Sequence, residues 1–256
     1  MNMINKICLL VLAACQPVLF PTTCAAGNDA DSTDAYRGII GVSLGTDIGG
    51  AIPYPVSNIP GTINAYPLIN VNPGIRFTFL PSKRWSPTAE AIYKTAGMKV
   101  DARVTNQRFN LDDATMYFSG TTTTEMKFSM IEIPVYVRYR LGGGHGIFAG
   151  AYYAAVFSSK FIAAPVKGYV GSSPDMAEIT DVSNISMDFT PYTDNWDCGL
   201  LAGYEYRIFA RMKIAARFSM GFKDIFKPQH RYFDYRMLHA RGSVTLSCDL
   251  IRIRQL

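Results

Sequence analysis

Ionisable side chains recur at alternate positions within segments that are otherwise apolar. Successive side chains of a β-strand point to opposite faces of the sheet, so this spacing gathers the charges on one face. Both signs are present, which allows the side chains to pair with one another. The spacing therefore predicts an interior network of ion pairs. Its expected members are Arg76, Glu90, Lys94, Glu132, Arg138, Arg140, Glu205, Lys213, Arg217, His239 and Arg241.

Three histidines, His145, His230 and His239, are the residues on which a hydrolytic site would depend. A Ser-His-acid triad needs all three groups within hydrogen-bond reach, and no such spacing recurs around these histidines. The best available constellation combines His239 with Ser243 or Glu205. A lipid-modifying outer-membrane hydrolase is therefore an alternative, whereas the sequence favours a protein that is not an enzyme and has no catalytic residue.

The remaining candidate sites have simple structural interpretations. The glycine run from Gly142 to Gly146 is followed by neither the Lys-Ser/Thr pair nor the helix of a phosphate-binding loop, which indicates a tight turn. Several acidic residues lack the close spacing of a calcium-binding loop. These are Asp175, Glu178, Asp181, Asp188, Asp194 and Asp197. We therefore expect no cofactor and no metal ion.

The composition is that of a folded domain with few charges. The chain has 256 residues, of which 48% are hydrophobic and 18% are charged. The formal net charge is +5, but the basic residues are dispersed and form no block, so nucleic-acid binding is not expected. Of the five cysteines, only Cys198 and Cys248 follow the N-terminal leader, and we predict no disulfide between them.

Residues 1–26 have the features of a secretory signal peptide. Lys6 precedes an apolar run, and small residues stand before a cleavage site after Ala26. The apolar run is shorter than the ~20 residues that a membrane-spanning helix needs. Alternatively, the sequence Leu-Ala-Ala-Cys ending at Cys15 is a lipoprotein box, and Cys15 is lipidated. A polar lead-in over residues 27–35 precedes the main domain, which is expected to cover residues 36–256.

Period-two alternation runs through most of the chain after the leader and predicts antiparallel strands. The expected strands cover residues 36–46, 68–80, 85–95, 125–141, 147–159, 191–206, 212–222 and 236–250. Within the segment that begins at Glu125, the apolar residues change from even positions to odd ones between Met130 and Ile131. This change predicts a β-bulge near Met130.

The connections between these strands alternate in length. Segments 47–67, 97–124 and 160–190 are long, whereas the connections between them are mostly short. Outer-membrane barrels have short periplasmic turns and longer external loops. We therefore expect an all-β, closed antiparallel eight-stranded up-and-down transmembrane β-barrel, integral to a bacterial outer membrane, whose long loops meet an external partner. Such a barrel is just wide enough for side chains to fill, so the inward charges should plug it.

A soluble ligand-binding barrel is the remaining alternative, because it would turn the apolar face inward. The two folds differ in the exposure of five residues, Ile133, Val135, Val137, Ile214 and Leu246. In a transmembrane barrel, aromatic residues should also gather in two girdles at the membrane borders. Phe148 and Phe161 are among the residues that we assign to these girdles.

The run Phe128–Pro134 (FSMIEIP) and the alternating strand Val135–Arg140 after it resemble the "LEIP" signature of the PorT-like outer-membrane β-barrel proteins of Bacteroidetes. Gly150–Tyr153 resembles the family's following strand, and Arg217–Ile225 resembles its penultimate strand region. The resemblance implies an outer-membrane barrel over roughly residues 36–256. The family's namesake serves a secretion apparatus, so the resemblance also implies a secretion-complex protein as a candidate partner beside the outer-membrane lipid. The sequence does not indicate an oligomeric state.

Overall fold

The computed structural model describes residues 36–55, 61–80, 82–111, 114–173, 179–183, 186–229 and 235–254. The predicted signal peptide, the polar lead-in and the Cys15 alternative lie outside these residues, as do Asp175, Glu178 and His230. The described part of the chain consists almost entirely of strands. None of its helices is long and apolar enough to cross a membrane.

The strands are β1 (Tyr36–Tyr54), β2 (Gly61–Pro67), β3 (Asn72–Phe79), β4 (Trp85–Leu111), β5 (Ala114–Gly142), β6 (His145–Gly171), β7 (Ile179–Asp181), β8 (Met187–Asp188), β9 (Trp196–Arg207), β10 (Met212–Asp224) and β11 (Arg236–Arg254). A short 3-10 helix, η4 (Thr190–Tyr192), lies between β8 and β9. Pro191 belongs to its first turn, where a missing N–H is tolerated. The strand predicted from residue 191 therefore begins at Trp196.

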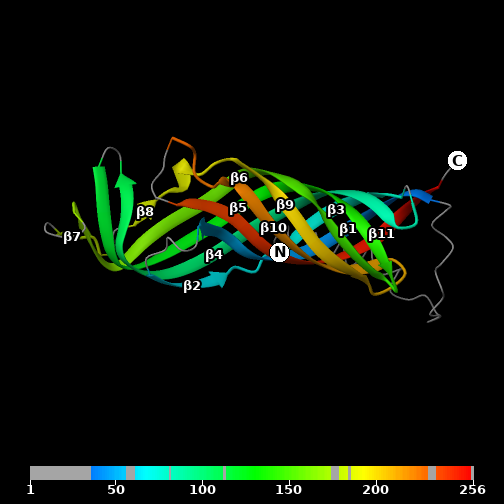
Figure 1. Ribbon diagram of the computed structural model, residues 1–256, viewed down its shortest axis with the longest axis horizontal. Coiled ribbons are helices and arrows are strands. Elements are labelled where there is room, and N and C mark those ends of the chain that lie inside the picture. The colour runs from blue at the N-terminus through cyan, green and yellow to red at the C-terminus, as the bar shows by residue number, and fades with distance from the viewer. Residues whose placement is uncertain are drawn as a thin grey trace, which may run out of the picture.

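Eight of these strands form a closed antiparallel ring. Hydrogen-bonded neighbours follow the order β4-β3-β1-β11-β10-β9-β6-β5, and β5 pairs with β4 to close the ring. Strand β2 adds to β4, while β7 and β8 add to β6. The barrel is elongated, with its long axis horizontal in Figure 1. The predicted eight-stranded up-and-down barrel is confirmed.

The two ends of the barrel differ in construction. At one end the connections are short, and the chain ends of β1 and β11 pair there through Tyr36 and Arg254. One short connection contains Gly142, Gly143 and Gly144 with φ angles of 100°, 58° and 85°, which non-glycine residues adopt only with strain. We call this the turn end. The opposite end, which carries β2, β7 and β8 in Figure 1, is the long end.

The strands reach much further at the long end than their sequence pattern predicts. Strands β4, β5 and β6 contain 27, 29 and 27 residues, whereas ~9 to 11 residues cross a membrane. Most of the expected loops 97–124 and 160–190 is therefore strand. The expected loop 47–67 likewise contains the end of β1 and all of β2. The prediction of three long loops was wrong, because residues that indicated a loop, such as Gly49 and Pro53 of β1, lie within strands.

The two faces of the barrel wall exchange polarity along its length. Even-numbered side chains of β4 point inward as far as Val104: Lys94 is buried near the turn end, and Met98 and Ala102 are buried further along. A register shift after Val104 then turns Phe109 inward. The outward side chains change in the opposite sense, from exposed Tyr93 to exposed Arg103. Polar side chains are thus inside near the turn end and outside at the long end.

Strand β5 shows the same exchange and corrects the predicted bulge. Its inward positions stay even-numbered from Met126 through Met130 to Glu132, so its faces do not change phase. The register between β5 and β6 does shift at Ser129/Met130, but the extra residue, Phe157, belongs to β6. Pairing of β5 with β4 is continuous there. The change from even to odd apolar positions marks the level at which the apolar face moves from inside to outside.

An apolar band surrounds the barrel toward the turn end. The five residues that separate the two barrel types are all on the outer surface: Ile133, Val135, Val137, Ile214 and Leu246 are 46, 56, 43, 39 and 42% exposed. On β5 the band covers residues 131–141. A rise of ~3.3 Å per residue and a tilt of ~40° give a height of ~28 Å, close to the ~25 Å apolar band of outer-membrane barrels. The apolar face is therefore outside, as a transmembrane barrel requires.

Aromatic side chains mark both borders of the apolar band. Trp85 and Tyr139, whose ring centroids are 4.7 Å apart, lie at the turn-end border. Exposed Phe157 lies at the opposite border, beside the register shift of β6. The assignment of Phe148 and Phe161 to the girdles was wrong, because both side chains are buried inside the barrel.

Candidate functional site in the barrel interior

The barrel interior contains the ionisable residues expected there. Strands β3, β4, β5, β9, β10 and β11 each contribute at least one, because their inward positions alternate with lipid-facing ones. The buried members are Arg76, Glu90, Lys94, Glu132, Arg138, Glu205, Lys213, Arg217, His239 and Arg241. Arg140 lies near the turn end and is half-buried. Ion pairs join most of these residues into three groups along the barrel axis.

The first group lies at the turn end and centres on Asp249. Its Oδ1 atom is 2.7 Å from Nη2 of Arg76, and its Oδ2 atom is 3.0 Å from Nζ of Lys213. A second pair joins Nη1 of Arg138 to Oε1 of Glu205 at 2.9 Å. These pairs join β3 and β10 to β11, and β5 to β9.

The second group is formed around Glu90. Arg217 Nη2 is 2.8 Å from one carboxylate oxygen, and the hydroxyl of Tyr136 donates to the other at 2.6 Å. The Arg217 guanidinium also lies over the rings of Tyr136 and Phe148, at 5.2 and 5.6 Å from their centroids. Phe148 can point inward because Gly203 faces it: a Cβ atom at Gly203 would lie 2.3 Å from its ring. Phe148, which we assigned to an aromatic girdle, thus contacts the Arg217 guanidinium inside the barrel.

The third group places Glu132 between two cations. Lys94 Nζ is 2.9 Å from Oε1 of Glu132, and Arg241 Nη2 is 2.7 Å from Oε2. Lys94 also pairs with Asp47 at 3.1 Å, and Arg241 Nη1 lies 3.0 Å from the sulfur of Met130. Glu132 and Arg241 have no exposed side-chain surface. Charges buried this completely persist only when paired and hydrogen-bonded, as these are.

A further polar contact joins β6 to β9 near the third group. The hydroxyl of Tyr152 donates to Oδ2 of Asp197 at 2.7 Å, and the guanidinium of Arg241 lies 5.3 Å from the Tyr152 ring centroid. Asp197 is one of the acidic residues that lack the spacing of a calcium-binding loop, and it is a buried residue of β9. No group of acidic, histidine or cysteine residues in the described part of the chain could hold a metal ion. Cys198 and Cys248 lie on β9 and β11, with β10 between them, and no disulfide joins them.

His239 is separate from the ion pairs. Its ring packs edge-on against Phe128, with centroids 4.9 Å apart, and its Nδ1 atom has no hydrogen-bond partner among the described residues. Glu205 is paired with Arg138, and no hydrogen bond connects His239 with Ser243 in the described structure. The constellation on which a hydrolase depends is therefore not assembled around this histidine.

Apolar side chains cover the third group on its long-end side. Met126, Phe128, Met130 and Phe161 are almost completely buried, and Phe128 contacts His239. These side chains separate the charged interior from the apolar interior of the long end. The barrel thus changes from a paired polar lumen to a hydrophobic core within a few residues.

Two acidic members of the network, Asp47 and Asp249, were not among the predicted interior residues. Asp249 occupies an inward position of the last strand, so its alternation with Ser247 was a usable signal. The glycines, prolines, asparagines and serines of segment 47–67 indicate a loop, which places Asp47 outside the predicted barrel wall. Strand β1 continues to Tyr54, which carries Asp47 into the lumen beside Lys94.

The arrangement fills the lumen with side chains that bind one another. An eight-stranded barrel leaves room for little else. Two of the ion pairs join strands on opposite sides of the ring: Glu90 and Arg217 join β4 to β10, and Glu132 and Arg241 join β5 to β11. The interior can therefore stabilise the closed wall and block the passage of solutes.

A family of known proteins matches most of the chain. Residues 31–227 match the family described as outer membrane protein beta-barrel domain. Similar solved structures include Neisserial surface protein A (9% identity, TM-score 0.39, covering 82% of this chain and 96% of that one). Ail, the attachment invasion locus protein of Yersinia pestis, shares 10% identity with a TM-score of 0.36, covering 82% and 99% of the two chains. OprG from Pseudomonas aeruginosa shares 10% identity with a TM-score of 0.32, covering 84% and 94%. No curated protein matches the sequence significantly.

Proposed function

The chain belongs to the outer membrane protein β-barrel domain family, and from this premise we propose that it is a non-enzymatic barrel, closed to solutes, whose long end serves interactions at the cell surface. In such barrels the short turns face the periplasm and the longer segments face outward. The turn end has the short connections, so the extensions of β4, β5 and β6 project from the outer leaflet. Their exposed Lys99 and Arg103 suit an aqueous surrounding.

The paired interior is the observation that carries the proposal that the barrel is closed. An open pore needs polar groups that line water, whereas in this lumen Glu90 is buried and paired with Arg217, and Glu132 is buried and paired with Arg241. The apolar layer of Phe128 and Met130 adds a second barrier. Opening a path through the lumen would require breaking the buried ion pairs, which is costly.

We expect the purified protein to produce no conductance steps when it is reconstituted into planar lipid bilayers. The reason is that ion flow requires a continuous water path, and three groups of paired side chains interrupt it. A general-diffusion porin inserted under the same conditions provides the positive control. Reproducible steps whose frequency rises with the amount of protein would contradict a closed barrel.

A second proposal is a role beside a secretion or envelope-assembly complex. It is favoured by the resemblance of Phe128–Arg140 to the PorT-like barrels of Bacteroidetes. Affinity purification of the tagged chain from its own membranes should then retain components of that complex. Purification without such components, together with normal secretion in a deletion strain, would count against this role and leave the closed barrel unaffected.

A further inference from the structure

A large apolar cavity occupies the interior of the long end. Its volume is about 430 Å³, within the range of ~300 to 1,000 Å³ that is typical of sites for small molecules. Close-packed protein interiors leave few voids larger than a water molecule, so a cavity of this size is not an ordinary packing defect. Strands β1, β2, β4, β5, β6, β8 and β11 all contribute to its wall.

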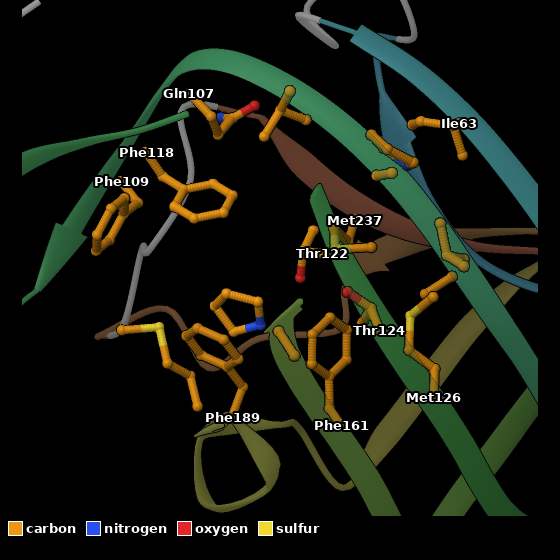
Figure 2. Close-up of a pocket in the computed structure, with 18 of the residues that line it drawn as sticks. Ile63, Gln107, Phe109, Phe118, Thr122, Thr124, Met126, Phe161, Phe189 and Met237 are labelled. Atoms are coloured by element: carbon orange, nitrogen blue, oxygen red, sulfur yellow. The ribbon is translucent and has the colours of Figure 1, made fainter. Parts of the chain in front are cut away.

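The part of the cavity wall that the described residues form is mainly apolar and carries no charged side chain. Figure 2 shows the aromatic rings of Phe109, Phe118, Phe161 and Phe189 around the space. Aliphatic residues of β1, β2 and β4 form the opposite wall. A charged ligand would lose its hydration here without gaining a partner, which makes its binding unfavourable.

Two hydroxyl groups interrupt this apolar wall. Thr122 and Thr124 are both inward residues of β5 and line the cavity, where their hydroxyls project toward its interior (Figure 2). Alternate strand residues lie about 6.5 Å apart on one face, so the two hydroxyls can reach one polar group from neighbouring positions. Gln107 and Tyr235 are two further polar lining residues. Burial raises the pKa of the Tyr235 phenol to about 12, which keeps it uncharged at physiological pH.

The cavity is closed toward the membrane, and one of its walls is the edge strand β2. Met126 and Phe161 form part of both its floor and the apolar layer above the ion pairs, so it does not continue into the charged lumen. Strand β2, which supplies Ile63 and Ala65 to the wall, pairs with β4 but with no other described strand. A small molecule can therefore enter beside β2 without breaking a ladder of backbone hydrogen bonds.

We propose that the cavity is a binding site for an uncharged, mainly apolar small molecule whose single hydrogen-bonding group contacts Thr122 and Thr124. This activity goes beyond the closed barrel described above, since it depends on the long end alone. An alkyl chain or a fused aromatic compound has the required chemistry. Such a compound occurs free or as the acyl chain of a membrane lipid.

The test uses the full-length protein in lipid nanodiscs and N-phenyl-1-naphthylamine, an uncharged fluorophore with one N–H group. Fluorescence titration should show saturable binding above the partition into empty nanodiscs. Ala102→Trp fills the cavity from its β4 wall and should weaken binding roughly tenfold or more. Arg103→Trp, which places the same side chain on the exposed outer face of β4, should leave binding unchanged.

A second variant keeps the proposal testable if the large tryptophan disturbs folding. Thr122→Val with Thr124→Val removes both hydroxyls at nearly constant volume and should weaken binding of the fluorophore roughly two- to tenfold. It should not change the dissociation constant of 1-benzylnaphthalene, which is determined by competition, because a methylene replaces the N–H in this compound. Binding equal to that of empty nanodiscs, or unchanged binding by both the Ala102→Trp and the double threonine variants, would overturn the proposal.

Competition then identifies the source of the ligand. Displacement of the fluorophore by dodecanol but not by dihexanoyl phosphatidylcholine would assign the site to free hydrophobic compounds. Displacement by both would assign it to lipid acyl chains. Failure of both competitors and of 1-benzylnaphthalene to displace the fluorophore would place the fluorophore outside the cavity and contradict the site. None of these outcomes depends on whether the barrel conducts ions, so the two proposals fail separately.

Discussion

Replacing Glu132 with alanine should destabilise the barrel by about 3–5 kcal/mol, because it leaves two buried cations without their shared partner. Glu132 forms an ion pair with Lys94 at 2.9 Å and accepts a hydrogen bond from Arg241 at 2.7 Å, and neither cation can reach water without moving the wall. Lys94 retains Asp47, whereas the direct contacts that remain to the Arg241 guanidinium among the described residues are with the Met130 sulfur and the Tyr152 ring. Urea unfolding of the protein in lipid vesicles measures the change.

Glu125→Ala on the same strand is the matched control. Glu125 pairs with Lys160 at 2.7 Å, but their side chains are 44 and 45% exposed. A surface pair of this kind contributes about 0–1 kcal/mol, since water screens the charges in either state. Equal destabilisation by the two substitutions would show that the buried pairs do not hold the barrel together.

Introducing an arginine at Val135 should cost about 2–4 kcal/mol, the range found for a cation on the lipid face near the bilayer midplane. Val135 is 56% exposed and stands in the middle of the apolar band of β5. Its outward direction gives the new charge no interior partner. The fraction of protein that folds into vesicles at increasing urea concentration reports the cost.

Thr121→Arg provides the comparison at the long end. Thr121 is exposed on the outer face of the same strand, beyond the exchange of polarity near Met130. The new side chain should meet water there and change stability by no more than about 0.5 kcal/mol. A similar cost at the two positions would mean that one environment surrounds the whole outer face.

The sequence allowed the ring of strands and the membership of the interior to be predicted, because both follow from period-two alternation. Residues such as Glu90 and Arg217 stand opposite apolar neighbours, and this pattern does not depend on knowing their partners. The partners themselves were not predictable. Pairing of Arg217 with Glu90 joins residues 127 positions apart, and its geometry depends on the stagger of the strands.

The length of the strands could not be derived in the same way. The third strand was expected to cover residues 85–95, and the segment 97–124, which contains Lys99 and Arg103, was expected to be mainly loop. In the structure these residues continue β4 into water while Met98 and Ala102 remain inside. Where a strand continues from lipid into water, its outward residues change from apolar to polar, although its side chains keep the same alternation.

The change of the apolar face from inside to outside also explains why a bulge was predicted in β5. Apolar residues at Met126 and Phe128 were assumed to share the outer face with Ile131 and Ile133, which required an extra residue between them. They face inward instead, above the membrane. The cavity was not predicted for a related reason, because its lining comes from segments that were interpreted as loops.

Spin-label accessibility measures the change from water to lipid along the outer face of β5. Single cysteines at Thr121, Lys127, Ile133, Val135 and Val137, in a background with Cys198→Ala and Cys248→Ala, are labelled in vesicles. Labels at 121 and 127 should respond mainly to a water-soluble nickel complex, and labels at 133–137 mainly to oxygen dissolved in lipid. Equal access of the nickel complex to all five positions would contradict the account.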